Sequence, residues 1–222
     1  MKLTVFQPWS EFVMKTVLPI ELLSNLIELT DLISKDFEKK TLNDSLAGEI
    51  DEEWIIDPPL LKNIKFTSFL FDMIREYLRL IKIQSRPKDT HLDCSIELFE
   101  ETHPFFKEKN WVIKSAWFNN QRDNEYNPCH NHSGMLSGVI FLRVPEYLPS
   151  RKNYYQDGSL NFTSTQTPND GLFTIPQFSV LPKVGDIFLF PSTLRHQVYP
   201  FRTKDGKGIR RSMSFNLDRG AG

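Results

Sequence analysis

The sequence has few cysteines and no long apolar run, and each absence excludes a class of protein. Its two cysteines, Cys94 and Cys129, are too few for a disulfide framework or a zinc site with four sulfur ligands. No stretch runs long enough without charge to span a bilayer, and the first residues, MKLTVFQPWSEF, lack the apolar core and cleavage site of a secretory signal. We therefore expect a cytoplasmic protein in a reducing compartment.

A surplus of basic residues is also missing. Lys and Arg total 27 against 28 Asp and Glu, which gives a formal net charge of -1. Proteins that derive their affinity from nucleic-acid phosphates usually carry a clear positive excess. The composition therefore does not favour nucleic acid as a partner.

The chain does have enough apolar residues for one sizeable core. Hydrophobic residues make up 40% of the 222 positions, so we predict a single domain over residues 1–222. Apolar residues at three- and four-residue spacing predict one helix from Pro19 to about Ser34 and a second from Ile64 to Ile83. Residues 1–110 would then be a mainly helical support that covers a sheet. A homodimer interface on the second helix is an alternative.

From Trp111 onward the sequence changes to short runs of β-branched and aromatic residues separated by glycine, proline and asparagine. Such runs are typical of an antiparallel β unit. Helices first and strands afterwards predict an α+β fold, mainly β, in which N-terminal helices pack on the outer sheet of a jelly roll formed by residues 111–217. Polar stretches at 145–159 and 164–170 are candidates for mobile loops. The expected strands are Trp111–Phe118, Ser137–Val144, Leu160–Thr163, Gly171–Ile175, Asp186–Phe190, His196–Pro200 and Ile209–Leu217.

Three histidines are placed where strands can bring them together. His130 and His132 lie just before an expected strand, and side chains two residues apart on an extended chain point to the same side. His196 follows the strand Asp186–Phe190 after a turn. Three imidazoles suit iron, zinc, copper or nickel and leave coordination positions for a substrate or for oxygen. The sequence therefore predicts a metal site without selecting the metal.

The last expected strand has two chemically different faces. The apolar face should pack against the helices, which turns Arg210 toward the interior of the jelly roll. A buried guanidinium is costly unless an anion meets it, and its fork with a neighbouring hydroxyl matches a carboxylate. An ordinary strand with a solvated arginine at its start is the alternative. The inward face carries Arg210, Ser212, Ser214 and Asn216, and the other face carries Arg211, Met213, Phe215 and Leu217.

Together these residues resemble the double-stranded β-helix oxygenases that depend on Fe(II) and 2-oxoglutarate, in particular a small branch found in bacteria and phages. The resemblance covers about Trp111 to Leu217. In a phage-encoded protein, the expected cytoplasm would be that of the host. The resemblance is carried by Trp117-Phe118-Asn119, His130-Asn131-His132, Leu136-Ser137-Gly138-Val139, Asp157-Gly158-Ser159-Leu160, Gly185-Asp186, Pro191-Ser192, His196 and Arg210-Arg211-Ser212.

The resemblance also implies roles for particular residues. Iron would be bound by His130, His132 and His196. The far carboxylate of 2-oxoglutarate would be bound by Arg210 and Ser212. The resemblance further suggests Tyr126 as a weaker candidate for a hydrogen bond to the cosubstrate.

One residue departs from the usual pattern of the family. Most members have Asp or Glu at the second ligand position, where this chain has His132. An imidazole in place of a carboxylate removes one negative charge from the metal's ligands, which should weaken Fe(II) binding and make zinc or nickel more competitive. Asp157 is an alternative second ligand. The imidazole also fills the space that a halide occupies in halogenating members, which disfavours halogenation.

The activity that the resemblance implies is the conversion of 2-oxoglutarate and O2 to succinate and CO2, with hydroxylation of a small molecule or peptide that the sequence does not identify. Two alternatives are open. One is a three-histidine dioxygenase of the cupin type that works without 2-oxoglutarate, which Arg210 argues against. The other is a non-catalytic β-sandwich, a binding or accessory protein whose histidines are incidental.

Overall fold

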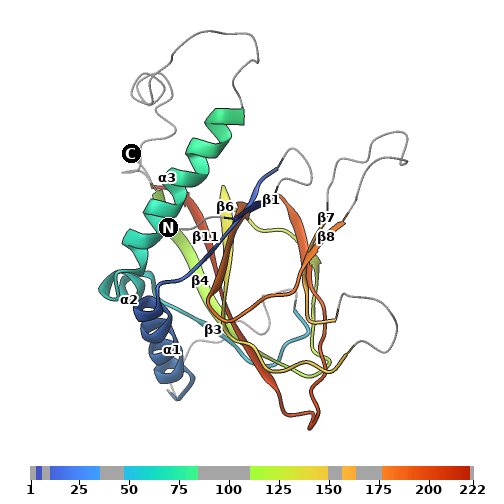
Figure 1. The fold of residues 1–222 in the computed structure, drawn as a ribbon. Coiled ribbons are helices and arrows are strands. Elements are labelled where there is room, and N and C mark those ends of the chain that lie inside the picture. The colour runs from blue at the N-terminus through green and yellow to red at the C-terminus, as the bar shows by residue number, and fades with distance from the viewer. Residues whose placement is uncertain are drawn as a thin grey trace, which may run out of the picture.

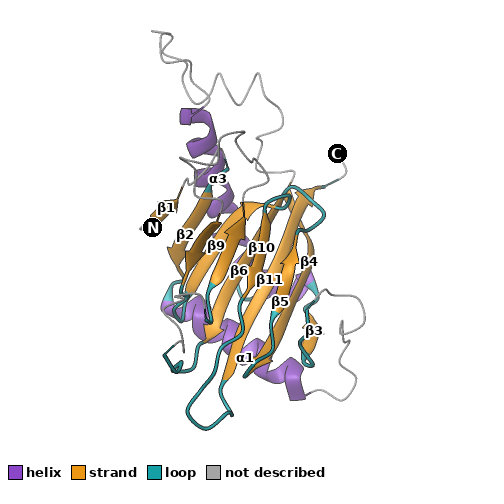
Figure 2. Cartoon of the chain, turned by 90° about the vertical axis from the view of Figure 1, so that its right-hand side faces the viewer, coloured by secondary structure: helices purple, strands orange, loops and turns teal. Residues whose placement is uncertain are grey.

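The computed structural model describes residues 4–6, 11–35, 48–84, 111–149, 157–163 and 177–220. Its strands are β1 (Thr4–Phe6), β2 (Val13–Val17), β3 (Glu53–Ile55), β4 (Trp111–Arg122), β5 (Asn127–His130), β6 (Leu136–Arg143), β7 (Leu160–Thr163), β8 (Gln177–Val180), β9 (Asp186–Pro191), β10 (Arg195–Val198) and β11 (Ile209–Arg219). They form a seven-stranded sheet in the order β1-β2-β9-β6-β11-β4-β3 and a four-stranded sheet in the order β5-β10-β7-β8. The two antiparallel sheets face each other (Figures 1 and 2). This is the mainly-β jelly-roll arrangement that the sequence predicts.

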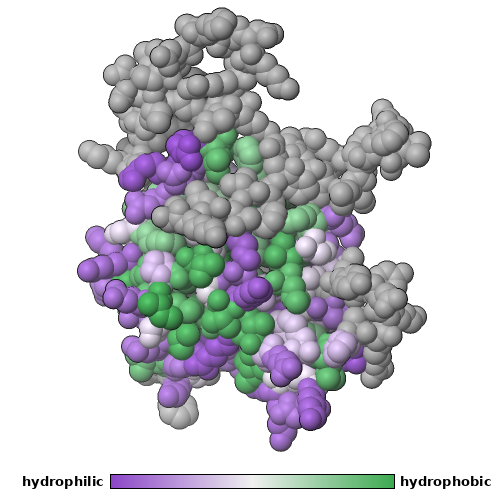
Figure 3. All heavy atoms as spheres, in the orientation of Figure 1, coloured by the Kyte–Doolittle hydropathy of each residue, from purple (hydrophilic) through white to green (hydrophobic). Residues whose placement is uncertain are grey.

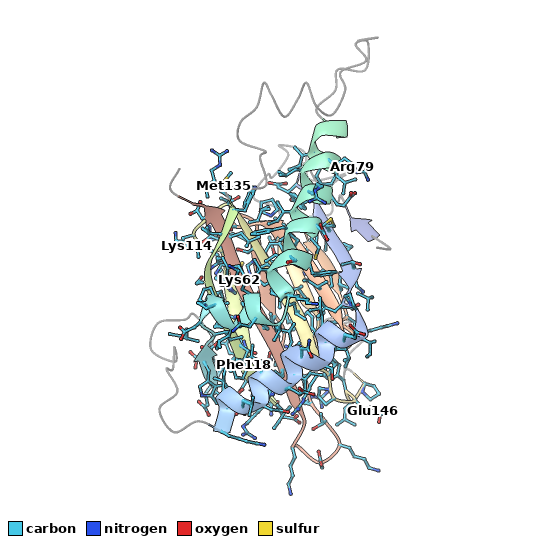
Figure 4. All side chains as sticks on the ribbon, turned by 90° about the vertical axis from the view of Figure 1, so that its left-hand side faces the viewer. Lys62, Arg79, Lys114, Phe118, Met135 and Glu146 are labelled. Carbon is cyan, nitrogen blue, oxygen red and sulfur yellow. The ribbon has the colours of Figure 1, made fainter. Side chains whose placement is uncertain are left out.

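Three helices, α1 (Ile20–Lys35), α2 (Pro58–Asn63) and α3 (Phe66–Gln84), cover the outer face of the seven-stranded sheet. Figure 4, viewed from the helix side, shows α1 and α3 in front of that sheet. Leu26 of α1, Met73 of α3 and Phe118 of β4 are all fully buried in one hydrophobic cluster. The expected second helix, Ile64 to Ile83, corresponds to α3, and the left-handed backbone of Lys65 (φ 62°) separates it from the short α2, which is not predicted. The prediction that the N-terminal helices cover the outer sheet is thus confirmed.

A second hydrophobic cluster fills the space between the two sheets. Its larger members are aromatic, and the rings of Phe162 and Phe190 lie 5.0 Å apart. On the helix-facing side of the seven-stranded sheet, Gly138 leaves room for the ring of Phe215. A Cβ at position 138 would collide with this ring. The two clusters therefore sit on opposite faces of the seven-stranded sheet. The inner cluster consists of Val13, Val139, Phe141, Leu160, Phe162, Phe188, Phe190 and Leu194.

The two faces of β11 are as different as the sequence predicts. Arg211 lies on the helix side, where its Nη1 is 2.6 Å from Asp31 Oδ1 and its Nε donates to Asn120 Oδ1 at 2.7 Å. Asp31 belongs to α1 and also pairs with Arg143 of β6. These ion pairs fix α1 against the sheet. Arg210 points the other way, into the space between the sheets, and is fully buried.

Several strands are absent from the sequence prediction. β1 and β3 have three residues each, which is too short for a period of two to be recognised. β5 contains Pro128, which argues against a strand in a sequence pattern. The predicted strand Gly171–Ile175 lies outside the described residues.

The surface mixes hydrophobic and hydrophilic residues. The described part of the face in Figure 3 shows hydrophobic areas between hydrophilic ones. Exposed large hydrophobic residues include Val17, Ile20, Leu181 and Val184. Exposed apolar residues are common on folded proteins and do not by themselves mark a site. Within the described segments, no helix combines the length and the apolar character needed to cross a membrane.

Candidate metal and cosubstrate site

Two of the predicted histidines are direct neighbours across the four-stranded sheet. His130 at the end of β5 pairs in register with His196 of β10, and their ring centroids lie 4.4 Å apart. His132 follows β5, and its backbone N–H donates to the carbonyl of Ser192 at 2.9 Å. Its ring is 4.8 Å from that of His130 and 5.0 Å from that of His196. The structure therefore brings all three predicted residues together.

The three histidines can all present a nitrogen to one ion. Their potential ligand atoms lie within 4.8 Å of one another. Metal–imidazole bonds of about 2.0–2.1 Å allow nitrogens on one ion to be up to roughly 4 Å apart, so small ring rotations suffice to bind one ion. Among the described residues, no other group of three or more His, Cys, Asp or Glu has this geometry.

Backbone carbonyls fix the tautomer of two of the rings. Nδ1 of His130 lies 2.6 Å from the carbonyl oxygen of Pro128, and Nδ1 of His196 lies 3.0 Å from that of Leu194. A carbonyl only accepts, so Nδ1 carries the proton in both rings and Nε2 keeps its lone pair. Hydrogen bonds of this kind are usual for histidines that bind metals.

Burial keeps the three rings neutral at physiological pH. It lowers the pKa of His130, and together with neighbouring histidines it lowers the pKa of His132 to about 4 and that of His196 to about 3. Neutral imidazole is the form that binds metal ions. The site therefore requires no proton release from these rings when a cation enters at neutral pH.

The predicted alternative ligand Asp157 does not lie in this group. Its Oδ2 is 3.6 Å from Nη2 of Arg202, and it is not part of the histidine cluster. His132 instead contacts Trp117, whose ring centroid is 5.4 Å away. In this structure, His132 and not Asp157 therefore completes the group with His130 and His196.

Arg210 is held by neutral groups. Its Nη1 donates to the carbonyl of Gly158 at 2.6 Å and to the hydroxyl of Tyr147 at 3.3 Å, and its Nη2 donates to Gln121 Oε1 and to the carbonyl of Tyr199 at 3.4 Å. These partners are not predicted from the sequence. Tyr147 falls in the stretch 145–159, a predicted candidate for a mobile loop, yet its ring packs on that of Phe201, with the centroids 4.9 Å apart. No local spacing pattern links residues so far apart in the chain.

The buried charge of Arg210 fits an anionic ligand. Burial lowers its pKa, but a guanidinium has so high an ordinary value that it stays charged. Within the described part of the chain, no carboxylate pairs with it, and its Nε is buried without a hydrogen-bond partner. A buried cation with a free donor is strongly destabilising unless an anion compensates it. The residues present therefore fit a carboxylate-bearing cosubstrate.

The other two predicted cosubstrate residues are placed differently from each other. Ser212 lies on the inner face of β11 beside Arg210 and donates to Asn119 Oδ1 at 2.9 Å. Tyr126 is 42% exposed, and its backbone carbonyl accepts from the N–H of Glu49. Among described residues, Tyr147 is the tyrosine whose hydroxyl bonds Arg210. A role for Tyr126 at the cosubstrate stays a prediction.

An apolar cavity of about 450 Å³ lies elsewhere, on the helix side of the seven-stranded sheet. Tyr77 and Ile81 of α3 and Trp111 of β4 line it. These residues belong to or pack against the outer hydrophobic cluster, whereas the histidines are on the inner side. We do not assign this cavity to the active site.

Comparison with known folds supports the jelly roll. A prolyl-4-hydroxylase from Pseudomonas putida is 17% identical, with coverage of 95% of this chain and 93% of that chain and a TM-score of 0.50. HygX from Streptomyces hygroscopicus, solved with nickel, 2-oxoglutarate and hygromycin B bound, is 9% identical, with coverage of 96% and 84% and a TM-score of 0.50. At such identities the likeness shows the fold alone. No match was found among curated proteins.

A family model matches residues 115–216, which include the three histidines, Arg210 and Ser212. The family is described as "Putative 2OG-Fe(II) oxygenase". Fe(II) and 2-oxoglutarate are accordingly its metal and cosubstrate. Residues 115–216 of this chain thus match the 2OG-Fe(II) oxygenase family.

Proposed function

We propose that this oxygenase is a hydroxylase that binds Fe(II) through His130, His132 and His196 and anchors the far carboxylate of 2-oxoglutarate at Arg210. The observation that carries the proposal is that three neutral imidazoles and a buried arginine without a carboxylate partner in the described chain lie inside the same jelly roll. When bound, iron and 2-oxoglutarate supply the oxidising chemistry, in which O2 is consumed and succinate and CO2 are formed.

The protein's own residues contribute binding, orientation and exclusion of water. Backbone carbonyls hold the proton of His130 and His196 on Nδ1, so no proton has to move between the ring nitrogens before Nε2 binds metal. The guanidinium of Arg210 lies 5.9 Å from the ring centroid of Phe141 and 5.1 Å from that of Phe201. These rings keep water from the anchor, which strengthens its interaction with a carboxylate.

The remaining expectations concern partners and location. We infer a small-molecule or peptide substrate, and the net charge of -1 does not favour nucleic acid. A single domain over residues 1–222, a cytoplasmic location and a homodimer through α3 stay predictions. The apolar side of α3 packs on the sheet, so a homodimer would have to use its remaining surface.

The function is tested by titrating the metal-free protein with Fe(II) and 2-oxoglutarate in the absence of oxygen. We expect an absorbance band that requires both, and slow succinate formation once air is admitted, even without the substrate. A protein that gives neither signal is not such an oxygenase. Oxygen consumption that does not depend on 2-oxoglutarate would favour the three-histidine dioxygenase of the cupin type instead.

Replacing His132 by aspartate tests the unusual second ligand. A carboxylate restores one negative charge next to the metal, so we expect His132→Asp to bind Fe(II) about tenfold more tightly and to lose part of its preference for zinc over iron. Competitive binding of the two metals to the wild type and the variant measures this. His132→Asn, which is similar in size but uncharged, is the matched control and should not gain affinity. Equal Fe(II) affinity of all three proteins would show that His132 is not a ligand.

A further inference from the structure

A buried carboxyl group, that of Glu53, lies close to the proposed cosubstrate anchor. Glu53 of β3 is only 1% exposed, although β3 is an edge strand. It pairs in register with Asn119 of β4, which in turn pairs with Ser212 of β11. Residues paired across strands lie on the same face of a sheet, so the three side chains form a row on the inner face.

The row is connected by hydrogen bonds. The Ser212 hydroxyl donates to Asn119 Oδ1 at 2.9 Å. Since Asn119 Oδ1 faces Ser212, its Nδ2 is the group available to Glu53, and a hydrogen bond from the Asn119 side chain favours the ionised form of Glu53. In this arrangement the only hydroxyl proton of Ser212 is already committed to Asn119. Ser212 cannot then donate to an anion at Arg210.

A second arrangement of the same row frees that proton. If the Asn119 amide turns over, its Nδ2 donates to Ser212 and its Oδ1 faces Glu53. An ionised carboxylate facing that oxygen would place two acceptors against each other, whereas a protonated carboxyl can donate to it. The Ser212 hydroxyl is then available to a ligand carboxylate. The two arrangements differ by one proton on Glu53.

Resting on the function proposed above, we propose that Glu53 is a positioning residue that controls Ser212 through Asn119, so that 2-oxoglutarate binds together with one proton taken up by the Glu53 carboxyl. The proton comes from solvent, and no covalent bond of the ligand changes. The negative charge of the bound ligand acts in the same direction, because a nearby anion favours the neutral form of a carboxyl group.

The other charges around Glu53 support this assignment. Burial raises the pKa of Glu53 to about 7, the hydrogen bond from Asn119 opposes this shift, and the like charge of Glu125 adds to it. Glu52 and Arg122 pair with each other. Arg210 on β11 is the buried cation beyond Ser212. The carboxyl can therefore gain or lose its proton close to neutral pH.

The pKa of Glu53 determines how the affinity for 2-oxoglutarate changes with pH. Below pH 7 Glu53 is protonated in the free protein and the binding arrangement is populated. Above pH 7 Glu53 must take up a proton from solvent for each ligand that binds, so the affinity for 2-oxoglutarate falls by up to tenfold per pH unit. Burial lowers the pKa values of the three histidine rings, which moves their titration away from this range. We expect the Kd for 2-oxoglutarate to be more than about tenfold higher at pH 8.5 than at pH 6.5.

Titration of the Fe(II)-loaded protein with 2-oxoglutarate at these two pH values, without oxygen, is the test. Glu53→Gln keeps the shape, cannot ionise and can donate to Asn119, so its Kd should be the same at both values and close to that of the wild type at pH 6.5. The control is Glu52→Gln, the same substitution one residue away in the chain, which should keep the wild-type pH dependence. Calorimetry at pH 8 in two buffers of different ionisation enthalpy should find close to one proton taken up per ligand by the wild type and none by Glu53→Gln.

Different results would contradict the role of Glu53 and the oxygenase function. A wild type that binds 2-oxoglutarate equally well at both pH values, or a Glu53→Gln variant that keeps the pH dependence, overturns the role of Glu53 and leaves the oxygenase intact. If Glu53→Gln does not fold, the number of protons that the wild type takes up per 2-oxoglutarate bound is the deciding measurement, and a value of zero overturns the role of Glu53. If the wild type shows no 2-oxoglutarate-dependent band at either pH, the proposed function itself fails.

Discussion

Replacing His196 by alanine is expected to reduce succinate formation from 2-oxoglutarate by more than about 100-fold, since losing even an outer-shell partner of a metal ligand typically costs 10–100-fold. The side chain is 5% exposed and lies between His130 and the ring of Phe190, whose centroid is 4.8 Å from its own. Removing it leaves two imidazoles and a space that water can enter. Metal content after anaerobic loading with Fe(II) should fall together with the activity.

Cys129→Ala is the matched control for this variant. Cys129 is exposed and directly precedes His130, so it alternates to the other side of β5. The Cys129→Ala variant should bind one equivalent of iron and form succinate at the wild-type rate. If His196→Ala binds iron with wild-type affinity, the histidine cluster is not the metal site, whatever the effect on activity.

The placement of His130 and His196 could be predicted because it depends on local patterns. The spacing of two in His130-Asn131-His132 and the turn before His196 are visible in the sequence. The same is true of β11, where alternation of polar and apolar residues correctly assigns Arg210 to the inside and Phe215 to the helix side. In each case the period of the strand carries the information.

The two tryptophans of β4 show where such reasoning fails. On a regular strand, Trp111 and Trp117 lie on the same face because they are six residues apart. The sequence therefore predicts that both belong to the core. The register shifts between Asn216 and Leu217, which pair with Ser115 and Ile113, so β4 has one extra residue at this point. This bulge reverses the alternation. Trp111 therefore joins the core under the helices, whereas Trp117 lies inside beside His132.

The surroundings of Arg210 and Ser212 could not be predicted for a different reason. Gln121, Tyr147 and Glu53 reach this site from three separate parts of the chain, and Glu53 lies on a strand of only three residues. Their proximity depends on how the strands are ordered in the sheet. Sequence periodicity gives the face of a residue on its own strand, but it does not give the neighbouring strand.

Replacing Arg210 by methionine is the second change with a large expected effect. Charge-assisted hydrogen bonds contribute about 1.5–3 kcal/mol each, so the Kd for 2-oxoglutarate should rise by about 100-fold. Methionine can occupy the space between Phe141 and Phe201, which keeps the interior filled. Arg210→Lys keeps the charge but loses the planar fork, so an intermediate rise of about tenfold is expected.

Arg211→Met provides the control, because it makes the same chemical change one residue along β11, on the opposite face. Arg211 bonds Asp31 of α1 and Asn120 of β4, so its loss leaves a carboxylate without one of its partners at the helix–sheet interface. This variant should have a lower free energy of unfolding but bind 2-oxoglutarate within about threefold of the wild type. The reverse result, with cosubstrate affinity lost in Arg211→Met and kept in Arg210→Met, would place the anion on the helix side. Denaturant titration and anaerobic absorbance titration of both proteins separate the two effects, since a general loss of folding would lower both measurements in both variants.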